Sequence, residues 1–459
     1  MKNKIKCNAP QSFLKTVLQI AIPVSLQALI ANSLGMVDQI MIGQLGEVCV
    51  TAVSLGGRPC FILIFALGGI CAAASIFASQ AEGAGDKAQH SKIMKASIAG
   101  CFLCVVPFFV LSFFFPSFTL TFFTSDSAVI QKGSGYLKIV STSYFAEIIL
   151  LSASAILRAT GNAKVPLVTG FISVVTNTAL NAILIFGHFG FPAMGERGAA
   201  FATVIARFLE AAILIIFMIA KNHPASIEKA FGAKCEKSFL RNFFITALPA
   251  IGNELLWAIG DAAYSAIYGH LGTFSLASMT LTFPVQGLSV GFFSGLSASA
   301  AIIIGNNLGS GKFDEAYKNS WHLIKYSVLG CIVMSAFLCF ARGFYVNLYE
   351  VDDAVKTVAS DLLLIFSAYL PVKVLNMVVG SGIIRSGGET KYTLFLDVVG
   401  TYAIGLPLGI ISAFVFKLPM QAVYAILSIE EIWRLVMGLR RVKMKKWIKQ
   451  VYAKNSSTN

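Results

Sequence analysis

Four polar side chains lie at a similar depth inside apolar stretches of this sequence, where they could bind a cation together. Asp38 lies about five residues before the end of the first stretch, Asn181 about six before the end of the fifth, and Thr203 about five after the start of the sixth. At 1.5 Å per helical residue, all three fall roughly 8 Å inside one boundary. Asn177 precedes Asn181 by one turn on the same face. One carboxylate with neutral amide and hydroxyl oxygens suits Na⁺, and a proton would neutralise Asp38 equally well.

The same side chains also have a structural interpretation, because asparagines in apolar helices often tie neighbouring helices together by hydrogen bonds. Three acids in apolar stretches of the second half add further candidates. Glu254 and Asp261 are seven residues apart, hence on one face of a helix, and Asp397 lies in a later stretch. An acid facing a wet cleft would attract an organic cation, and one facing the protein interior could carry a proton. Glu254, Asp261 and Asp397 are therefore candidates for a substrate or proton site.

Other acids in apolar stretches have a basic residue nearby. Glu210 stands three residues after Arg207, and Glu430 and Glu431 stand one helical turn before Arg434. Side chains at this spacing are neighbours on a helix surface. We therefore predict structural ion pairs at these two places.

The stretches that carry these residues have the composition of membrane-spanning helices. The chain has 459 residues, of which 56% are hydrophobic and only 13% charged. Apolar runs long enough to cross roughly 30 Å of hydrocarbon recur from end to end. We predict an all-α membrane protein with twelve transmembrane helices, at approximately residues 13–42, 48–80, 92–116, 134–157, 166–187, 198–220, 239–269, 273–304, 321–343, 357–384, 392–416 and 420–439.

The sequence also contains an internal repeat, in which the second half has the same pattern as the first. The stretches that begin at Pro23 and at Pro249 share their internal spacing, at an offset of 249 − 23 = 226 residues, and the same offset relates Gly85 to Gly311. Six spans per repeat let both halves enter the membrane from the same side, which predicts two parallel, pseudo-symmetric six-helix lobes around a central cleft. This arrangement suits alternate exposure of a central site, so transport is the first hypothesis.

A polar, basic segment in the middle of the chain divides the repeats. It has the sequence KNHPASIEKAFGAKCEKS and occupies residues 221–238. We predict an N-terminal lobe at residues 1–220, a cytoplasmic linker at 221–238, a C-terminal lobe at 239–440 and a basic cytoplasmic tail at 441–459.

The net charge of +14 reflects membrane topology rather than nucleic-acid binding. Most of the 36 basic residues fall in loops on one side of the predicted spans and in the tail; the loops on the other side hold only Lys132, Arg197, Arg342, Lys356 and Lys417. The positive-inside rule then predicts that both termini are cytoplasmic. We expect a multi-pass protein of the cytoplasmic (inner) membrane, with the lipid bilayer as a partner and no nucleic acid.

Motifs for enzymatic chemistry are missing or incomplete. GNNLGSGK at residues 305–312 resembles a phosphate-binding loop, but Asn306 stands where a glycine is needed and Phe313 replaces Ser or Thr. No HExxH pair and no GxSxG element occurs. We predict that the protein is not an enzyme and has no cofactor.

Several longer segments resemble the multidrug and toxic compound extrusion family. The resemblance covers nearly the whole chain, in order, in both halves. It is carried by VDQIMIGQLG at 37–46, LRATGNAKVPL at 157–167, NTALNAILIFGHFGFPAMGERGAAFATVIAR at 177–207, GNELLWAIGDAAYSAIYGHLG at 252–272, IRSGGETKYTLFLD at 384–397 and EEIWR at 430–434.

The resemblance implies a two-lobed, twelve-helix antiporter, driven by inward Na⁺ or H⁺, that exports cationic amphiphilic compounds. Small organic cations would then be its substrates, and we expect a monomer. The family's cation-coupling site maps onto Asp38, Asn177, Asn181 and Thr203, which would be Na⁺ ligands if sodium drives transport. Some branches place an acid on span seven eight residues after its proline, which here is Trp257. The alternative is a flippase for lipid-linked saccharides, although such a protein would need a cleft rich in arginine.

Overall fold

The computed structural model describes residues 10–451, and of residues 10–12, 34 and 36 it describes the backbone alone. The described residues form helices and connecting loops without any strand. The first half contains α1 (Pro10–Gly43), α2 (Glu47–Gly56), α3 (Arg58–Ala84), α4 (Ala88–Phe114), α5 (Pro116–Thr121), α6 (Ser127–Val140), η1 (Ser141–Ser143), α7 (Tyr144–Ala159), α8 (Lys164–Phe186), η2 (His188–Gly190), α9 (Glu196–Ala220) and α10 (Ile227–Gly232).

The second half begins with four long helices and continues in shorter helical segments. It contains α11 (Lys237–His270), α12 (Thr273–Gly309), α13 (Phe313–Val346), α14 (Asp353–Asn376), η3 (Met377–Ile384), η4 (Arg385–Gly387), α15 (Thr390–Val398), η5 (Val399–Gly405), α16 (Leu406–Ile410), η6 (Ile411–Val415), α17 (Met420–Leu427) and α18 (Ile429–Lys443). The segments η3, η5 and η6 are turns of wider π-helix.

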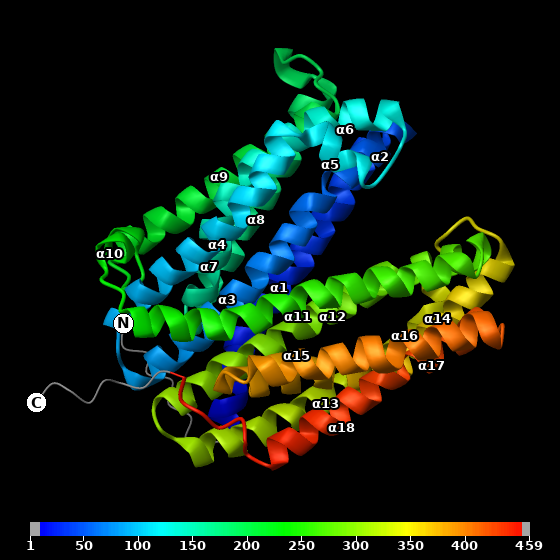
Figure 1. Ribbon diagram of the computed structural model, residues 1–459. Helices are drawn as coiled ribbons and strands as arrows, with labels where there is room; N and C mark the ends of the chain where they lie inside the picture. Colours follow the sequence, from blue (N-terminus) through cyan, green and yellow to red (C-terminus); the bar gives the residue numbers. More distant parts are fainter. Residues whose placement is uncertain (1–9, 452–459) are drawn as a thin grey trace, which may run out of the picture. The chain divides into compact units, whose positions relative to one another are not determined.

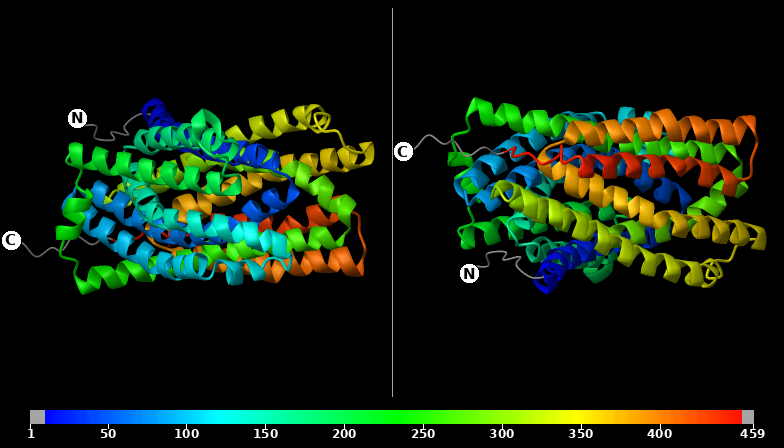
Figure 2. Two further views of the ribbon diagram at one scale, coloured as in Figure 1. Left: turned by 90° about the horizontal axis from the view of Figure 1, so that it is seen from above. Right: turned by 90° about the horizontal axis from the view of Figure 1, so that it is seen from below.

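The described helices confirm an all-α membrane fold. Eleven helical stretches of the described chain are long and apolar enough to cross a bilayer, and each corresponds to one of the first eleven predicted spans. The twelfth predicted span, residues 420–439, is divided between α17 and α18, which follow each other directly across Ser428 (orange to red in Figures 1 and 2). The division leaves two helices that are each shorter than a bilayer requires.

Contacts among the described residues define two compact units, one of residues 26–251 and one that combines residues 10–25 with residues 252–451. We call them the amino-terminal unit and the carboxyl-terminal unit. The boundaries lie inside the long helices α1 and α11, whereas the predicted linker at 221–238 contains the short helix α10 and ends at the start of α11. The predicted lobe boundaries remain a prediction.

Close backbone contacts explain why α1 and α11 are each divided between the two units. In the carboxyl-terminal unit, a Cβ atom added to Gly295 of α12 would lie 2.1 Å from the carbonyl oxygen of Ala21 in α1. In the amino-terminal unit, a Cβ atom on Gly69 of α3 would lie 2.4 Å from the backbone of Ile251 in α11. A side chain at either glycine would force the helices apart, so glycine allows these contacts.

In the amino-terminal unit, α8 and α9 pack against each other along their length (Figure 1). Helix α3 packs against α4 and α7, and α2 packs against α6. One buried apolar cluster joins α1, α6, α8 and α9, with Ile42, Leu137, Ile185 and Ala199 among its members. This cluster fixes the mutual positions of the helices that carry Asp38, Asn181 and Thr203.

In the carboxyl-terminal unit, α14 is the central helix and packs against α12, α13, α17 and α18. Phe366, Leu370 and Val374 of α14 belong to a large buried apolar cluster. The same cluster contains Trp447, which follows the last helix. The described residues after α18 are therefore part of the folded unit.

Candidate functional site

The structure brings the four side chains of the predicted cation site together in the amino-terminal unit. The Nδ2 atom of Asn181 donates to Asp38 Oδ1 over 2.7 Å and lies 3.1 Å from Asn177 Oδ1. The Nδ2 atom of Asn177 lies 3.3 Å from Thr203 Oγ1. Three helices, α1, α8 and α9, thus meet through one continuous set of polar contacts.

Apolar packing one helical turn away holds this set in place. Ile42 follows Asp38 by four residues, Ile185 follows Asn181 by four, and Ala199 precedes Thr203 by four. Residues at this spacing share a helix face, and Ile42, Ile185 and Ala199 all belong to the buried cluster that joins α1, α8 and α9. Packing of these apolar neighbours therefore orients the polar side chains on the same helix faces toward one another.

Gly198 allows the close approach of α9 to α8 at this level. A Cβ atom added to Gly198 would lie 2.5 Å from the carbonyl oxygen of Leu184. A Cβ atom does not approach a carbonyl oxygen this closely, so any larger residue would push the two helices apart. The contact between Asn177 and Thr203 depends on this short distance between α8 and α9.

The site has more oxygen acceptors than protein donors. Asn177 and Asn181 are only 3% and 1% exposed, and Asn181 Oδ1 is buried without a hydrogen-bond partner among the described residues. Rotating the Asn177 amide lets its nitrogen donate to Asp38 Oδ1 over 3.0 Å and its oxygen accept from the Thr203 backbone N–H over 3.2 Å. A buried amide oxygen left unpaired beside a carboxylate matches the donor set that a hard monovalent cation requires.

Asp38 is free of any ion pair with a basic side chain among the described residues. The nearby Arg207 is taken by two buried acids, Glu147 and Glu210, each at 3.2 Å. The Arg207 to Glu210 contact confirms the ion pair predicted from their spacing. Because two acids already balance this arginine, the charge of Asp38 remains available for a mobile cation.

The acids of the second half lie in the carboxyl-terminal unit, and two of them have arginine partners. Glu254 pairs with Arg385 over 2.9 Å, and Asp397 pairs with Arg434 over 3.2 Å. Asp261 forms no ion pair among the described residues, and its side chain is exposed. The predicted substrate or proton roles of Glu254, Asp261 and Asp397 remain predictions.

These pairs belong to one polar network. Arg385 donates to Asn253 Oδ1 over 2.5 Å, and Asn253 in turn donates to Asp397. Arg434 also contacts Glu430, one turn earlier on α18, over 3.1 Å. Two arginines are thus surrounded by three acids, and both arginines are more than nine-tenths buried.

Sequence reasoning missed Arg385 as a partner of Glu254. Of the two acids predicted to pair with Arg434, Glu430 does so at four-residue spacing, whereas Glu431 accepts from Asn376 over 2.7 Å. Arg385 was expected in a loop but follows the π-helical segment η3 inside the helical span that ends at Gly387. The sequence offered one signal for these arginines, namely that the acids Glu254 and Asp397 need basic partners inside a membrane.

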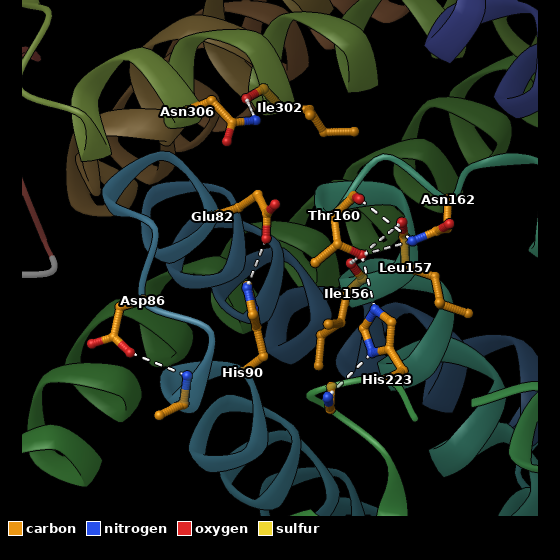
Figure 3. A network of polar contacts seen from close by, with 12 residues as sticks. Glu82, Asp86, His90, Ile156, Leu157, Thr160, Asn162, His223, Ile302 and Asn306 are labelled. Atoms are coloured by element: carbon orange, nitrogen blue, oxygen red, sulfur yellow. Dashed lines mark hydrogen bonds and ion pairs between the residues drawn. The ribbon is translucent and has the colours of Figure 1, made fainter. Parts of the chain in front are cut away.

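A second polar cluster lies where loops of the amino-terminal unit converge (Figure 3). His90 Nε2 lies 3.0 Å from Glu82 Oε2. His223 accepts from the Ala225 backbone N–H at Nδ1 over 3.2 Å, and its Nε2 lies 3.3 Å from Thr160 Oγ1. His223 thereby ties the loop after α9 to the loop after α7.

The His223 contacts are expected to weaken as the pH falls. Burial, with a further contribution from the neighbouring His90, lowers the pKa of His223 from 6.5 to about 4. The folded loop therefore binds a proton less readily than the opened loop, and its stability declines between about pH 6.5 and about pH 4. Hydrogen–deuterium exchange at Ala225, corrected for intrinsic rates, should show faster opening at pH 5 than at pH 7.

The matched control is His223→Asn, whose amide oxygen can still accept from Ala225 but does not titrate. This variant should show no change in opening between the two pH values. Equal pH dependence in the variant and the original protein would assign the effect to other groups, of which Glu82, His90 and Lys229 lie nearest.

Among the described residues, no group of three or more His, Cys, Asp or Glu side chains is arranged to hold a metal ion. The site at Asp38 differs from such a group because it combines one carboxylate with amide and hydroxyl oxygens. A set of this kind suits a weakly held monovalent ion rather than a resident transition metal.

Comparison with known proteins shows which family this chain resembles. The MatE family model matches residues 23–183 and 249–411, so its two copies begin at the two prolines of the internal repeat. The chain is 21% identical over 429 residues to the uncharacterized transporter YisQ of Bacillus subtilis, covering 93% of this chain and 94% of that protein. It is 24% identical over 399 residues to the probable multidrug resistance protein NorM of Pasteurella multocida, covering 86% and 85%.

A solved structure has the same fold. The crystal structure of MATE in the bent conformation superposes with a TM-score of 0.85 at 17% identity, covering 95% of this chain and 96% of that one. Since the family model spans well over half of the chain in two copies, the chain belongs to the MatE family of membrane transporters.

Proposed function

We propose that this protein is a secondary antiporter that exports cationic amphiphilic compounds and is driven by inward movement of Na⁺ or H⁺. Membership of the MatE family supports a transporter, and several relatives carry names such as multidrug resistance protein NorM and MdtK. No chemical step on the substrate is required, so the protein would act without a cofactor and would not be an enzyme.

The observation that carries this proposal is the half-buried Asp38 with an unused amide oxygen beside it. Asn181 donates to Asp38 and joins α1 to α8. A bound Na⁺ or proton neutralises Asp38 and removes the need for that donor. The amide of Asn181 can then turn its unpaired oxygen toward the cation, which alters the link between the two helices.

Coupling to export follows from conformation rather than from direct competition. If the cation binds more tightly to one conformation of α1 than to another, it shifts the population toward that conformation. A substrate that prefers the other conformation is then released, and the linkage is reciprocal. The cation and the organic compound need not share a single ligand.

For the substrate, the acids of the carboxyl-terminal unit remain our candidates. Arg385 and Arg434 balance Glu254 and Asp397, whereas Asp261 is exposed and without an ion pair among the described residues. An unbalanced carboxylate in an apolar setting attracts an organic cation. Asp261 is therefore the acid most available to such a substrate, and Glu254 and Asp397 would act only after their arginines are displaced.

We further propose an inner-membrane location with both termini in the cytoplasm. Support comes from the excess of Lys and Arg in the loops on one side of the helices. The outermost basic residues Lys2, Lys4, Lys6 and Lys454 lie outside the described residues.

The alternative of a lipid-linked saccharide flippase finds less support. Such a protein needs arginines that are free to bind phosphates. Arg207, Arg385 and Arg434 lie within helices, and each is engaged by at least one acid. Arg58 and Arg158 also lie within the spans and form no ion pair among the described residues, so of these five arginines only these two could bind a phosphate without losing an acid partner.

The test is efflux of a fluorescent cationic dye from proteoliposomes under separate Na⁺ and pH gradients. We expect one gradient, or both, to accelerate dye movement over the rate measured without a gradient. The ineffective gradient identifies the ion that is not coupled. Dye movement that is indifferent to both gradients would contradict antiport.

A further inference from the structure

The segment after the last helix is docked onto the carboxyl-terminal unit. Residues 444–451, which we call the docked segment, turn back beyond the end of α18. Trp447 in its middle is fully buried within the main apolar cluster, and its indole Nε1 donates to the carbonyl oxygen of Val442 over 3.2 Å. The burial of the largest side chain type fixes this segment in position.

Two loops of the same unit hold the docked segment. Gln450 donates to the carbonyl oxygen of Leu308 over 2.8 Å, at the end of α12. Glu389, before α15, forms ion pairs with both Arg441 and Lys449. Burial raises the pKa of the Glu389 carboxyl, but its bonds to Lys449 and Arg441 outweigh this and lower the pKa overall.

A glycine makes room for the docked segment. A Cβ atom on Gly387 would lie 1.7 Å from the carbonyl oxygen of Trp447. No other residue type fits there without moving one of the two backbones. The docked segment is thus built into the fold rather than resting on its surface.

The basic residues around this segment fall into two sets. Arg441 and Lys449 pair with Glu389, and Lys445 lies over the ring of Tyr317 at 4.5 Å. Arg440, Lys443 and Lys446 are exposed, and none of the three forms an ion pair among the described residues. These three, which we call the basic triad, are spaced three residues apart along the chain at the end of α18 and the start of the docked segment.

The triad also continues the apolar face of α18. Ile429, Ile432 and Val436 are exposed on this helix at spacings of three and four residues, so they form one stripe. Arg440 follows Val436 by four residues and Lys443 follows by three more. The apolar part of this stripe suits contact with lipid chains. Because the stripe becomes basic at Arg440, this end of α18 lies at the level of the lipid headgroups.

We propose that Arg440, Lys443 and Lys446 form a binding surface for the headgroups of anionic phospholipids in the leaflet at the carboxyl end of α18. Clusters of Lys and Arg next to a membrane helix attract anionic lipid electrostatically, and the three side chains can donate hydrogen bonds to phosphate oxygens. The bound lipid holds α18, which carries Glu430 and Arg434, at a constant depth. This lipid site goes beyond the proposed antiport.

The test uses the purified full-length protein and counts bound phosphatidylglycerol and phosphatidylcholine by native mass spectrometry. The original protein should retain phosphatidylglycerol in preference. The triple variant R440Q/K443Q/K446Q should lose roughly tenfold or more of that preference, since each basic residue near the surface adds to the attraction. The variant R440K/K443R/K446R should keep it.

The matched control is K221Q/K234Q/K237Q, which removes the same charge from exposed residues near the linker. It should bind phosphatidylglycerol like the original protein. An unchanged preference in the triad variant, or an equal loss in both triple variants, would overturn the assignment to the triad. Monodisperse elution and an unchanged melting temperature establish that the variants are folded.

If the triad variant does not fold, the original protein still provides a decisive measurement. Its phosphatidylglycerol preference should fall as salt screens the headgroup charge. A preference that persists at high salt would contradict an electrostatic surface. Either result is independent of dye transport, so failure of this proposal leaves the proposed antiport untouched.

Discussion

Asp38→Asn is expected to abolish cation-driven efflux while leaving the protein folded. The asparagine has nearly the same size and can still hydrogen-bond to Asn181, so the link between α1 and α8 is retained. It carries no charge for Na⁺ to balance and cannot take up a proton at this position. With coupling energies of roughly 1–3 kcal/mol in such systems, driven dye transport in proteoliposomes should fall about tenfold or more, to the rate measured without a gradient.

Asp352→Asn is the matched control for this substitution. Asp352 caps α14 by accepting from the Ala354 N–H over 3.2 Å, and asparagine caps helices equally well. The control should retain driven efflux. Undiminished driven transport in Asp38→Asn would show that the coupling ion binds elsewhere, and equal loss in both variants would point to a general effect of the substitution.

The depth of the polar residues in the membrane could be predicted from the sequence, because a membrane helix must match the thickness of the hydrocarbon layer. The length of each apolar run sets where it meets the boundary, so Asp38, Asn181 and Thr203 could be placed at one level before their contacts were known. Their packing neighbours Ile42, Ile185 and Ala199 follow from helical spacing. The unpaired oxygen of Asn181 could not be predicted, because it depends on the orientation of an amide.

The carboxyl-terminal network was harder to predict. Arg385 and Glu254 are 131 residues apart, and nothing local in the sequence specifies that they meet. The π-helical segments η3 and η5 add to the difficulty, because wider turns shift the residues after them relative to an ideal helix. Arg385 follows η3, and Thr401, which accepts from Arg434, lies within η5.

The two halves also differ in what the repeat preserves. The offset of 226 residues places Tyr264 where Asp38 stands in the first half, so the second half has no carboxylate at the corresponding position. Glu254 and Asp397 are instead balanced by arginines from η4 and α18. The repeat has kept the helices but not the charges that they carry.

Arg434→Met is expected to destabilise the carboxyl-terminal unit severely. Arg434 is 8% exposed and contacts Asp397 over 3.2 Å and Glu430 over 3.1 Å. Gly400 in η5 leaves room for its side chain, since a Cβ atom there would lie 2.3 Å from Arg434 Nε. Methionine fills similar space but leaves two acids uncompensated. Breaking a buried pair in this way costs about 3–5 kcal/mol, measurable as a lower melting temperature in detergent.

The decisive comparison restores charge balance without restoring the arginine. In R434M/D397N/E430Q the two acids become neutral amides of nearly the same shape, and the cost of an unpaired buried charge disappears. We expect this triple variant to recover most of the melting temperature lost in Arg434→Met. A triple variant as unstable as the single one would mean that Arg434 acts through packing against Gly400 rather than through its charge. An Arg434→Met protein as stable as the original would show that Asp397 and Glu430 find other partners or water.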